Sequence, residues 1–154
     1  MPKTLGKDSS CSIARALDAL GDAWTILIIR EALVSGATRF QEFQDALGIA
    51  PNVLAKRLAA LVESRVMTRR AYRDAGVRSR EEYILTEAGR GLSIVVAALS
   101  SWARTYRPSE EGTSPRFLTA AGSAPAQLAF IDERGSIVPP EDLVAVRTPD
   151  RERA

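Results

Sequence analysis

The sequence predicts a mainly α-helical fold with one β-hairpin, followed by a small C-terminal β appendage. Several stretches before residue 66 place apolar residues at helical spacing, two β-prone stretches flank a polar connector around residue 76, and short β-prone runs return after residue 127. With 154 residues, of which 45% are hydrophobic and 26% charged, the chain is long enough for one ordinary soluble domain and a short appendage.

Two helices are predicted at the start of the chain. The first covers Ser10–Leu20, and Gly21 is suited to end it in a left-handed conformation. Asp22 then caps a second helix, which ends near residues 35–36. The first helix carries a stripe formed by Ile13, Leu17 and Leu20.

A pair of shorter helices follows. Thr38 and Gln41 have the spacing of a capping box at the start of one, and Gly48 closes it. Pro51, a favoured first helical residue, begins the other, which runs to Ser64. Two short helices joined by a tight glycine-containing turn form a helix-turn-helix.

A hairpin and a long last helix complete the predicted domain. The strands are Val66–Tyr72 and Glu82–Leu85, joined by the connector Arg73–Glu81, so the hairpin is the wing of a winged helix-turn-helix. Thr86 caps the last helix, which ends near Arg107. Its apolar stripe consists of Leu92, Val95, Val96, Leu99, Trp102 and Tyr106.

The composition indicates three segments. Residues 1–107 form the winged helix-turn-helix and dimerisation domain, 108–126 form a linker rich in Ser, Gly, Ala and Pro, and 127–154 form the appendage. Strands are expected at Leu128–Ile131, Ile137–Val138 and Leu143–Arg147, in a β unit that is only marginally stable.

Positive charge is concentrated in one segment. Residues 52–80 carry eight cations and two acidic residues, a local net charge of +6, so the rest of the chain carries −4 of the total +2. A basic segment on an acidic body is expected of a protein that neutralises phosphates with one face. The eight cations are Lys56, Arg57, Arg65, Arg69, Arg70, Arg73, Arg78 and Arg80.

The composition argues against enzyme chemistry. Without histidine and with one cysteine, the chain cannot supply a Ser-His-Asp triad, a His-ligated metal or a Cys₄ zinc site, so we expect no enzyme, metal or cofactor. The longest apolar run, Ile26–Ile29, is far shorter than the ~20 residues of a spanning helix. We therefore expect a cytoplasmic protein without membrane contact.

Three ordered motifs between Cys11 and Tyr106 resemble the HxlR family of MarR-like regulators. They are CSIARALDALGDAWTILIIREAL, TRFQEFQDALGIAPNVLAKRLAALVESRV and EYILTEAG. The resemblance implies a dimeric, often autoregulatory, winged-helix DNA-binding protein. It also implies a candidate sensor of oxidants or electrophiles at Cys11, whose alternative reading is a small buried apolar residue.

The chain departs from the family pattern at three places. Ala50 replaces the usual serine that caps the recognition helix, Ser12 replaces proline, and the wing between Tyr72 and Tyr83 is longer and lacks a proline pair. These departures concern helix capping, the cysteine's role and the wing contacts.

Candidate DNA contacts lie on the helix-turn-helix and the wing. Pro51 opens the recognition helix, in which Asn52 and Val53 are candidate base readers and Lys56 a candidate phosphate contact. Arg57 is either a phosphate contact or half of a structural ion pair.

The wing and the first motif helix supply further candidates. Arg78 and Arg80 at the wing tip are candidates for the minor groove, whereas Arg69, Arg70 and Arg73 are expected to follow the DNA backbone. The helix N-terminus at Thr38 and Arg39 offers amides to a phosphate, with Thr38 equally readable as a simple cap.

The apolar stripes predict a homodimer. The last helix is longer than a domain of this size covers alone, so part of its stripe, together with Ile13 and Leu17 of the first helix, is assigned to a second copy. The predicted function is a sequence-specific regulator of double-stranded DNA, with repression as the default. The alternatives are a winged-helix interaction module, or a sensor whose appendage binds a protein or a small-molecule effector.

Overall fold

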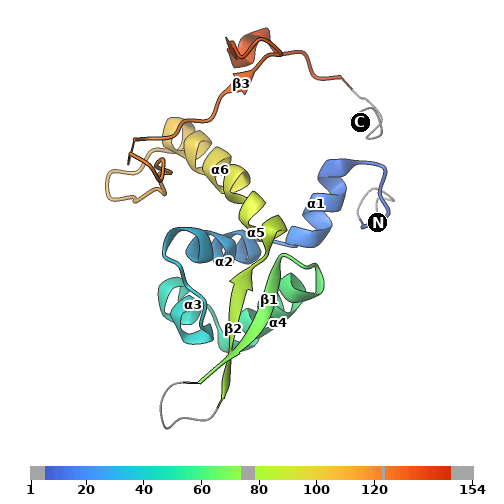
Figure 1. The fold of residues 1–154 in the computed structure, drawn as a ribbon, viewed down its shortest axis with the longest axis vertical. Helices are drawn as coiled ribbons and strands as arrows, with labels where there is room; N and C mark the ends of the chain where they lie inside the picture. The colour runs from blue at the N-terminus through green and yellow to red at the C-terminus, as the bar shows by residue number, and fades with distance from the viewer. Residues whose placement is uncertain (1–5, 74–78, 123, 147–154) are drawn as a thin grey trace. The chain divides into compact units, whose positions relative to one another are not determined.

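The computed structural model describes residues 6–73, 79–122 and 124–146 (Figure 1). Two compact units divide at the boundary between Val96 and Ala97. The first unit contains helices α1 to α5, the hairpin β1–β2 and the first residues of helix α6. The second contains the rest of α6 and the short elements that follow it.

Helices α1 (Ser12–Leu20) and α2 (Ala23–Val34) match the predicted pair. Helix α1 begins two residues later than predicted, with Cys11 as its N-cap residue. Gly21 ends α1 as predicted and has a positive φ of 71°, but its ψ of −75° differs from the left-handed helical conformation that was predicted. The carboxylate of Asp22 accepts a hydrogen bond from the Thr25 amide at 3.2 Å, which confirms the predicted cap of α2.

Helices α3 (Phe40–Leu47) and α4 (Pro51–Glu63) form the helix-turn-helix. Gly48 is left-handed, with φ 60° and ψ 22°, and ends α3 as predicted. Pro51 is the first residue of α4, also as predicted. The turn between the helices therefore follows directly from local sequence.

The predicted capping box at the start of α3 is wrong. Arg39, not Thr38, is the N-cap residue, and Glu42, not Gln41, closes the first turn. The Glu42 carboxylate accepts hydrogen bonds from the Thr38 amide at 2.8 Å and the Arg39 amide at 2.9 Å. The Thr38 hydroxyl instead donates to Glu82, a residue 44 positions further along the chain.

The wing is an antiparallel hairpin of β1 (Met67–Tyr72) and β2 (Arg80–Leu85), with Met67 opposite Leu85 and Tyr72 opposite Arg80. Strand β2 begins two residues earlier than predicted, so Arg80 and Glu81 belong to the strand rather than to the connector. The predicted wing-tip residue Arg78 lies outside the described residues. A fold of helices with one such hairpin confirms the predicted winged helix-turn-helix class.

The predicted single last helix is two helices, α5 (Glu87–Gly91) and α6 (Ser93–Tyr106). Thr86 caps α5 as predicted, since its hydroxyl oxygen accepts a hydrogen bond from the Gly89 amide at 3.1 Å. The break at Leu92 has a local cause: two glycines in five residues favour helix weakly, and the Leu92 amide bonds the Gly89 carbonyl in a tight i to i−3 turn.

The core of the first unit is formed by side chains from α2, α3, α4 and β1. Helix α4 contributes one continuous buried face, which fixes the orientation of its opposite, exposed face. The largest fully buried side chains are Phe43, Ile28, Ile29, Leu54, Leu58, Leu61 and Met67.

In the second unit, the described residues after α6 form only short elements. These are β3 (Phe130–Ile131), antiparallel to β4 (Ile137–Val138), and a 3₁₀ turn, η1 (Pro140–Asp142). The first two predicted strands are therefore present, the first of them shortened. The third, predicted at Leu143–Arg147, is wrong over 143–146, where the chain has no strand partner, and Arg147 lies outside the described residues.

The predicted linker has some structure of its own. The Pro115 carbonyl accepts hydrogen bonds at 3.2 Å from the Ser100 hydroxyl and from the Arg104 guanidinium, both on α6. A turn follows, closed by a hydrogen bond of 2.8 Å from the Thr119 amide to the Ala124 carbonyl. The middle of the predicted linker, at Pro115, is therefore held against the C-terminal half of α6.

Candidate nucleic-acid interface

The exposed face of α4 carries the residues predicted to read DNA. Pro51, Asn52 and Lys56 are exposed and Val53 is half-buried, while Leu54 on the opposite face is fully buried. At Ala50 no side chain caps the helix, as expected from the missing serine. The amide and ammonium groups of this face are free to meet base edges and phosphates.

Arg57 is paired with an acidic residue of its own chain. Its guanidinium forms an ion pair with Asp22, the same carboxylate that caps α2. The pair joins the candidate recognition helix to the start of α2, and the Arg57 side chain is only 29% exposed. Of the two roles predicted for Arg57, the structural ion pair is the one present here.

The wing cations are partly neutralised by acidic neighbours. Arg70 Nε donates to Glu82 at 2.7 Å, and Arg69 pairs with Glu81 at 3.8 Å. The basic segment counted from the sequence stops at Arg80, just before these two acids, so residues 52–82 carry a net charge of +4. Arg73 and Arg80 are exposed and are the more available wing cations among the described residues.

Two carboxylates at the base of the wing are held in their ionised form. The Arg70 guanidinium lowers the pKa of Glu82, and the Thr38 hydroxyl contributes in the same direction. The amides of Arg39 and Thr38 lower the pKa of Glu42. Both side chains are therefore negatively charged at neutral pH, so they offset part of the positive charge of the wing.

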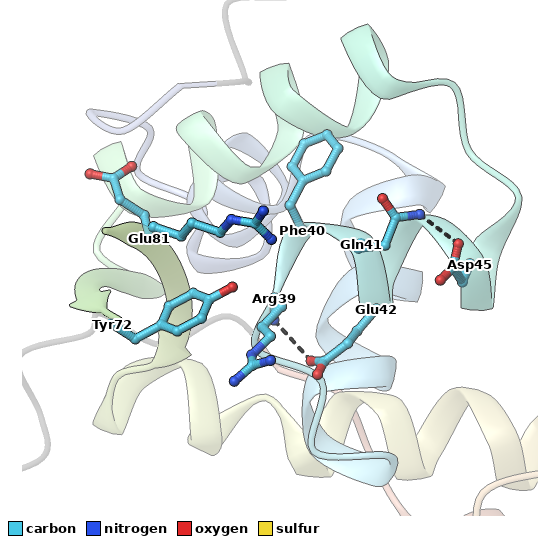
Figure 2. Close-up of a pocket in the computed structure, with 8 residues that line it drawn as sticks. Arg39, Phe40, Gln41, Glu42, Asp45, Tyr72 and Glu81 are labelled. Carbon is cyan, nitrogen blue, oxygen red and sulfur yellow. Dashed lines mark hydrogen bonds between the residues drawn. The ribbon is translucent and has the colours of Figure 1, made fainter. Parts of the chain in front are cut away.

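An open notch of about 540 Å³ lies between the first turn of α3 and the hairpin (Figure 2). The Arg39 guanidinium lies 4.4 Å from the centre of the Tyr72 ring, a cation–π contact between the start of α3 and the end of β1. On the α3 side, Gln41 donates to Asp45 at 2.7 Å. The lining residues are Arg39, Phe40, Gln41, Glu42, Asp45, Tyr72, Arg80 and Glu81.

The hydrogen bonds at the start of α3 argue against the phosphate-binding role predicted for Thr38 and Arg39. Their amides, expected to bind a phosphate, are already donated to Glu42. Sequence reasoning also missed Tyr72 and Glu82, which contact this segment from the hairpin. The available signal was an acidic pair, Glu81 and Glu82, in an otherwise basic wing, but its partners depend on the strand register.

The predicted dimer residues are of two kinds. In α1 and α6, five of them keep half or more of their surface exposed: Ile13 (69%), Leu17 (53%), Leu99 (51%), Trp102 (53%) and Tyr106 (61%). The Trp102 and Tyr106 rings lie 5.6 Å apart and form one aromatic surface on α6. Leu92 and Val95 are half-buried, and Val96 is 4% exposed and offers little surface to a second copy.

Cys11 is exposed at the N-terminus of α1. Its backbone amide donates a hydrogen bond to the Ser9 hydroxyl oxygen at 3.2 Å. The alternative reading of Cys11 as a small buried apolar residue is therefore wrong.

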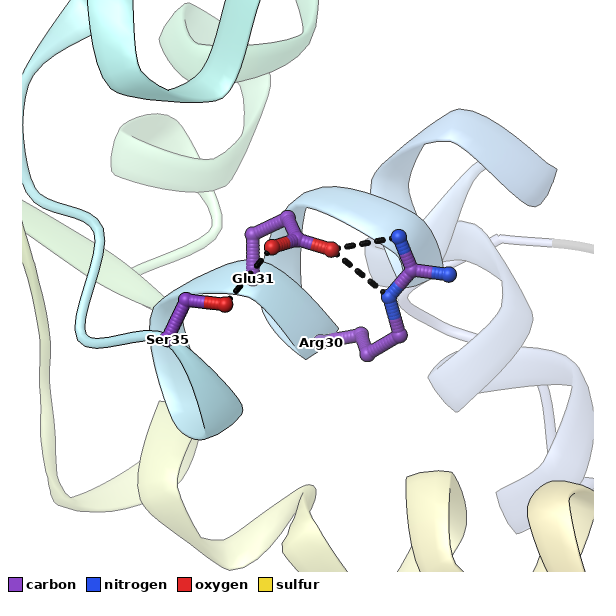
Figure 3. Close-up of polar contacts among 3 residues, drawn as sticks. All are labelled: Arg30, Glu31 and Ser35. Carbon is purple, nitrogen blue, oxygen red and sulfur yellow. Dashed lines mark hydrogen bonds and ion pairs between the residues drawn. The ribbon is translucent and has the colours of Figure 1, made fainter. Parts of the chain in front are cut away.

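Glu31 is a buried acidic residue in α2 that serves the fold (Figure 3). Its carboxylate pairs with the Arg30 guanidinium and accepts a hydrogen bond from the Ser35 hydroxyl at 2.9 Å. Both carboxylate oxygens therefore have partners.

Across the described ranges, no three acidic or cysteine side chains are grouped as a metal site requires, and no helix is long and apolar enough to cross a membrane.

Comparison with known proteins gives consistent matches. A family model described as HxlR-like helix-turn-helix matches residues 19–111. A relative from Mycobacterium tuberculosis strain H37Rv, described as an uncharacterized HTH-type transcriptional regulator, is 42% identical over 101 residues. The match covers 66% of this chain and 62% of that relative, so the chain spans about three fifths of its length. YvaP of Bacillus subtilis, described in the same way, is 34% identical, with 60% of this chain and 83% of YvaP covered.

Solved structures agree with the sequence matches. The candidate transcription factor PA1607 has a TM-score of 0.74 and 38% identity, covering 92% of this chain and 98% of its own. The redox regulator HypR, in its reduced form, has a TM-score of 0.55 and 26% identity, covering 63% of this chain and 94% of its own. The likeness to PA1607 therefore extends beyond the winged helix into the C-terminal unit.

Proposed function

The chain belongs to the HxlR-like helix-turn-helix family, and we propose that it is a transcription regulator that binds a pseudo-palindromic operator as a homodimer and represses transcription. In this mechanism each copy of α4 enters a major groove, and the two copies lie ~34 Å apart on one face of the duplex. The bound dimer occludes the promoter.

One observation carries this proposal: α4 has an exposed polar face directly beside a hairpin with exposed arginines. Asn52 supplies an amide that can pair with adenine, and Val53 offers an apolar contact for a thymine methyl. Lys56, Arg73 and Arg80 supply charge for phosphates or a narrow minor groove. Arg57, held by Asp22, acts by fixing the orientation of α4 rather than by touching DNA.

The homodimer is proposed from the exposed apolar residues of α1 and α6. A twofold dimer needs a self-complementary apolar surface, and each of the two helices supplies exposed large apolar side chains for one. Dimerisation also sets the distance between the two copies of α4, so it determines which operator spacing fits.

A redox response at Cys11 is a second candidate function. The exposed thiol at a helix N-terminus and the likeness to HypR, described as a redox regulator, favour it. Oxidation to the sulfenic acid, followed by condensation with a thiol, would form a mixed disulfide. Replacing Cys11 with serine should abolish any change in operator affinity caused by hydrogen peroxide.

Salt titration of DNA binding tests the main proposal. The operator is first selected from random duplexes with the wild-type chain. Lys56→Ala should weaken binding to all sequences and reduce the slope of log affinity against log salt by about 0.9. Asn52→Ala should keep the slope and relax the base preference at one position of each half-site, by roughly 1–3 kcal/mol.

Arg116→Ala is the matched control, because Arg116 is an exposed arginine that belongs to neither the helix-turn-helix nor the wing. It should leave the slope unchanged. A wild-type chain that shows no salt-dependent binding to any duplex would refute the proposal and favour the interaction-module alternative.

A further inference from the structure

We propose that Glu82 is a positioning residue for DNA specificity: it fixes the wing against the segment before α3, so that wing and recognition helix meet DNA in one register. This inference rests on the proposed DNA binding and adds a residue that does not itself touch DNA. The contacts involved are called the wing clamp here and comprise Thr38, Arg39, Arg70, Tyr72 and Glu82.

Glu82 joins both sides of the wing clamp through its two carboxylate oxygens. Oε2 accepts a hydrogen bond from the Thr38 hydroxyl at 3.0 Å, and Oε1 accepts one from Arg70 Nε at 2.7 Å. The Glu82 side chain is 12% exposed. One side chain on β2 therefore connects the start of the helix-turn-helix to an arginine of β1.

The backbone and an aromatic contact support the same junction. The Tyr83 amide donates to the Thr38 carbonyl at 2.7 Å, and Arg39 forms a β-bridge with Glu82. The Arg39 guanidinium stacks over Tyr72, the last residue of β1 (Figure 2). The segment before α3 thus acts as a short third strand on the β2 edge, and a two-stranded hairpin alone is only marginally stable.

The charge of Glu82 distinguishes positioning from direct DNA contact. A carboxylate on a surface that approaches phosphates opposes binding of any duplex. Removing its charge should therefore strengthen non-specific binding. If the same change weakens specific binding, the loss comes from geometry or from a lost base contact, because electrostatics alone predicts the opposite sign. Thr38→Val separates these two causes, since it keeps the carboxylate and removes only its partner.

Glu81 provides a matched control on the same strand. It carries the same charge, is exposed, and has one distant ion pair with Arg69. Because successive strand residues point to opposite sides, Glu81 does not share the partners of Glu82. Glu81→Gln and Glu82→Gln therefore change the charge equally but affect different contacts.

The experiment measures affinity for the selected operator and for a scrambled duplex of the same length. Glu82→Gln should raise scrambled-duplex affinity about twofold and lower operator affinity about tenfold. Glu81→Gln should raise both affinities together and leave their ratio unchanged. Thr38→Val, which removes only the hydroxyl donor, should lower the ratio without changing scrambled-duplex affinity.

Hydrogen exchange at the Tyr83 amide tests the wing clamp without DNA. Exchange should become about tenfold faster in Glu82→Gln and Thr38→Val, but not in Glu81→Gln. Equal ratios for Glu82→Gln and Glu81→Gln, or unchanged exchange in Thr38→Val, would overturn the inference. If the wild-type chain binds no duplex, the proposed function fails, and exchange at Tyr83 still decides whether Glu82 positions the hairpin.

Discussion

The two units of the chain differ in how far their apolar side chains are buried. In the first, Phe43, Leu54 and Leu58 have no exposed surface, and they come from helices that close on one another. In the second, the described residues after α6 keep large apolar side chains in the open, including Ile137 at 74% and Val144 at 84% exposure. The first unit has its own core, whereas the described residues after α6 in the second unit pair only as a ladder of two-residue strands.

This difference shows which conclusions each unit supports. A self-contained core fixes the exposed face of α4 and the base of the wing, so the candidate interface follows from the packing of a single chain. An apolar appendage without a core is stable only if something else covers it. Stability measurements on the two units are therefore a direct test of the comparison.

The largest expected effect comes from truncating the first unit's core. Leu58→Ala removes a fully buried side chain and should lower the free energy of unfolding by about 3 kcal/mol. Val144→Ala removes a side chain that is 84% exposed and should change it by less than about 0.5 kcal/mol. Both values come from urea denaturation followed by circular dichroism.

An equal loss in the two variants would break the comparison. It would mean that Val144 is covered in solution, so that the appendage contributes to the stability of the folded assembly.

Local signals in the sequence predicted much of the first unit. Gly48 and Pro51 mark the turn between α3 and α4, and Asp22 and Thr86 cap helices where expected, because each effect involves residues only a few positions apart. The apolar spacing of α4 likewise separated its buried face from its exposed face. These features account for the helix-turn-helix and for the candidate DNA-contact residues on it.

Long-range contacts were not predictable in the same way. The ion pair of Arg57 with Asp22 and the bond from Thr38 to Glu82 join residues far apart in sequence. Both depend on how helices pack and on strand register, and neither is encoded in spacing. The wrong prediction of the α3 capping box has the same origin. The Thr38 hydroxyl bonds the distant Glu82 carboxylate, and Glu42 instead accepts the hydrogen bond from the backbone amide of Thr38.

A second prediction concerns how tightly the first unit is packed around Gly89. A Cβ atom at this position would lie 2.2 Å from the Val66 carbonyl oxygen, so backbone would have to move. Gly89→Ala should therefore destabilise the unit by about 2 kcal/mol. Gly91, in the same helix, has open space around it, and Gly91→Ala should raise stability by about 0.5–1 kcal/mol.

Thermal unfolding of the two alanine variants checks this pair. Opposite signs would sharpen the view of a closely packed first unit. A Gly89→Ala variant as stable as Gly91→Ala would show that α5 can move away from the Val66 backbone without cost.

The smallest effect on folding, and the most informative one on assembly, is expected at Trp102. Its side chain is 53% exposed on α6 and stacks with Tyr106, so a single chain gains little stability from burying it. If the exposed stripe is the dimer surface, an aromatic residue within it is a suitable anchor. Trp102→Ala should then weaken dimerisation by about 2 kcal/mol, which is roughly thirtyfold in the dissociation constant, while circular dichroism shows an intact fold.

Val34→Ala is the control, because Val34 is exposed to a similar extent, 52%, but lies on α2 outside the stripe. Sedimentation equilibrium on the wild type and both variants separates the outcomes. Operator binding should fall with dimerisation in Trp102→Ala, because a monomer makes only one half-site contact. A monomeric wild type, or a Trp102→Ala dimer as strong as the Val34→Ala dimer, would show that α6 is not the dimer surface. The exposed apolar residues that follow α6 would then be the next surface to test by the same measurement.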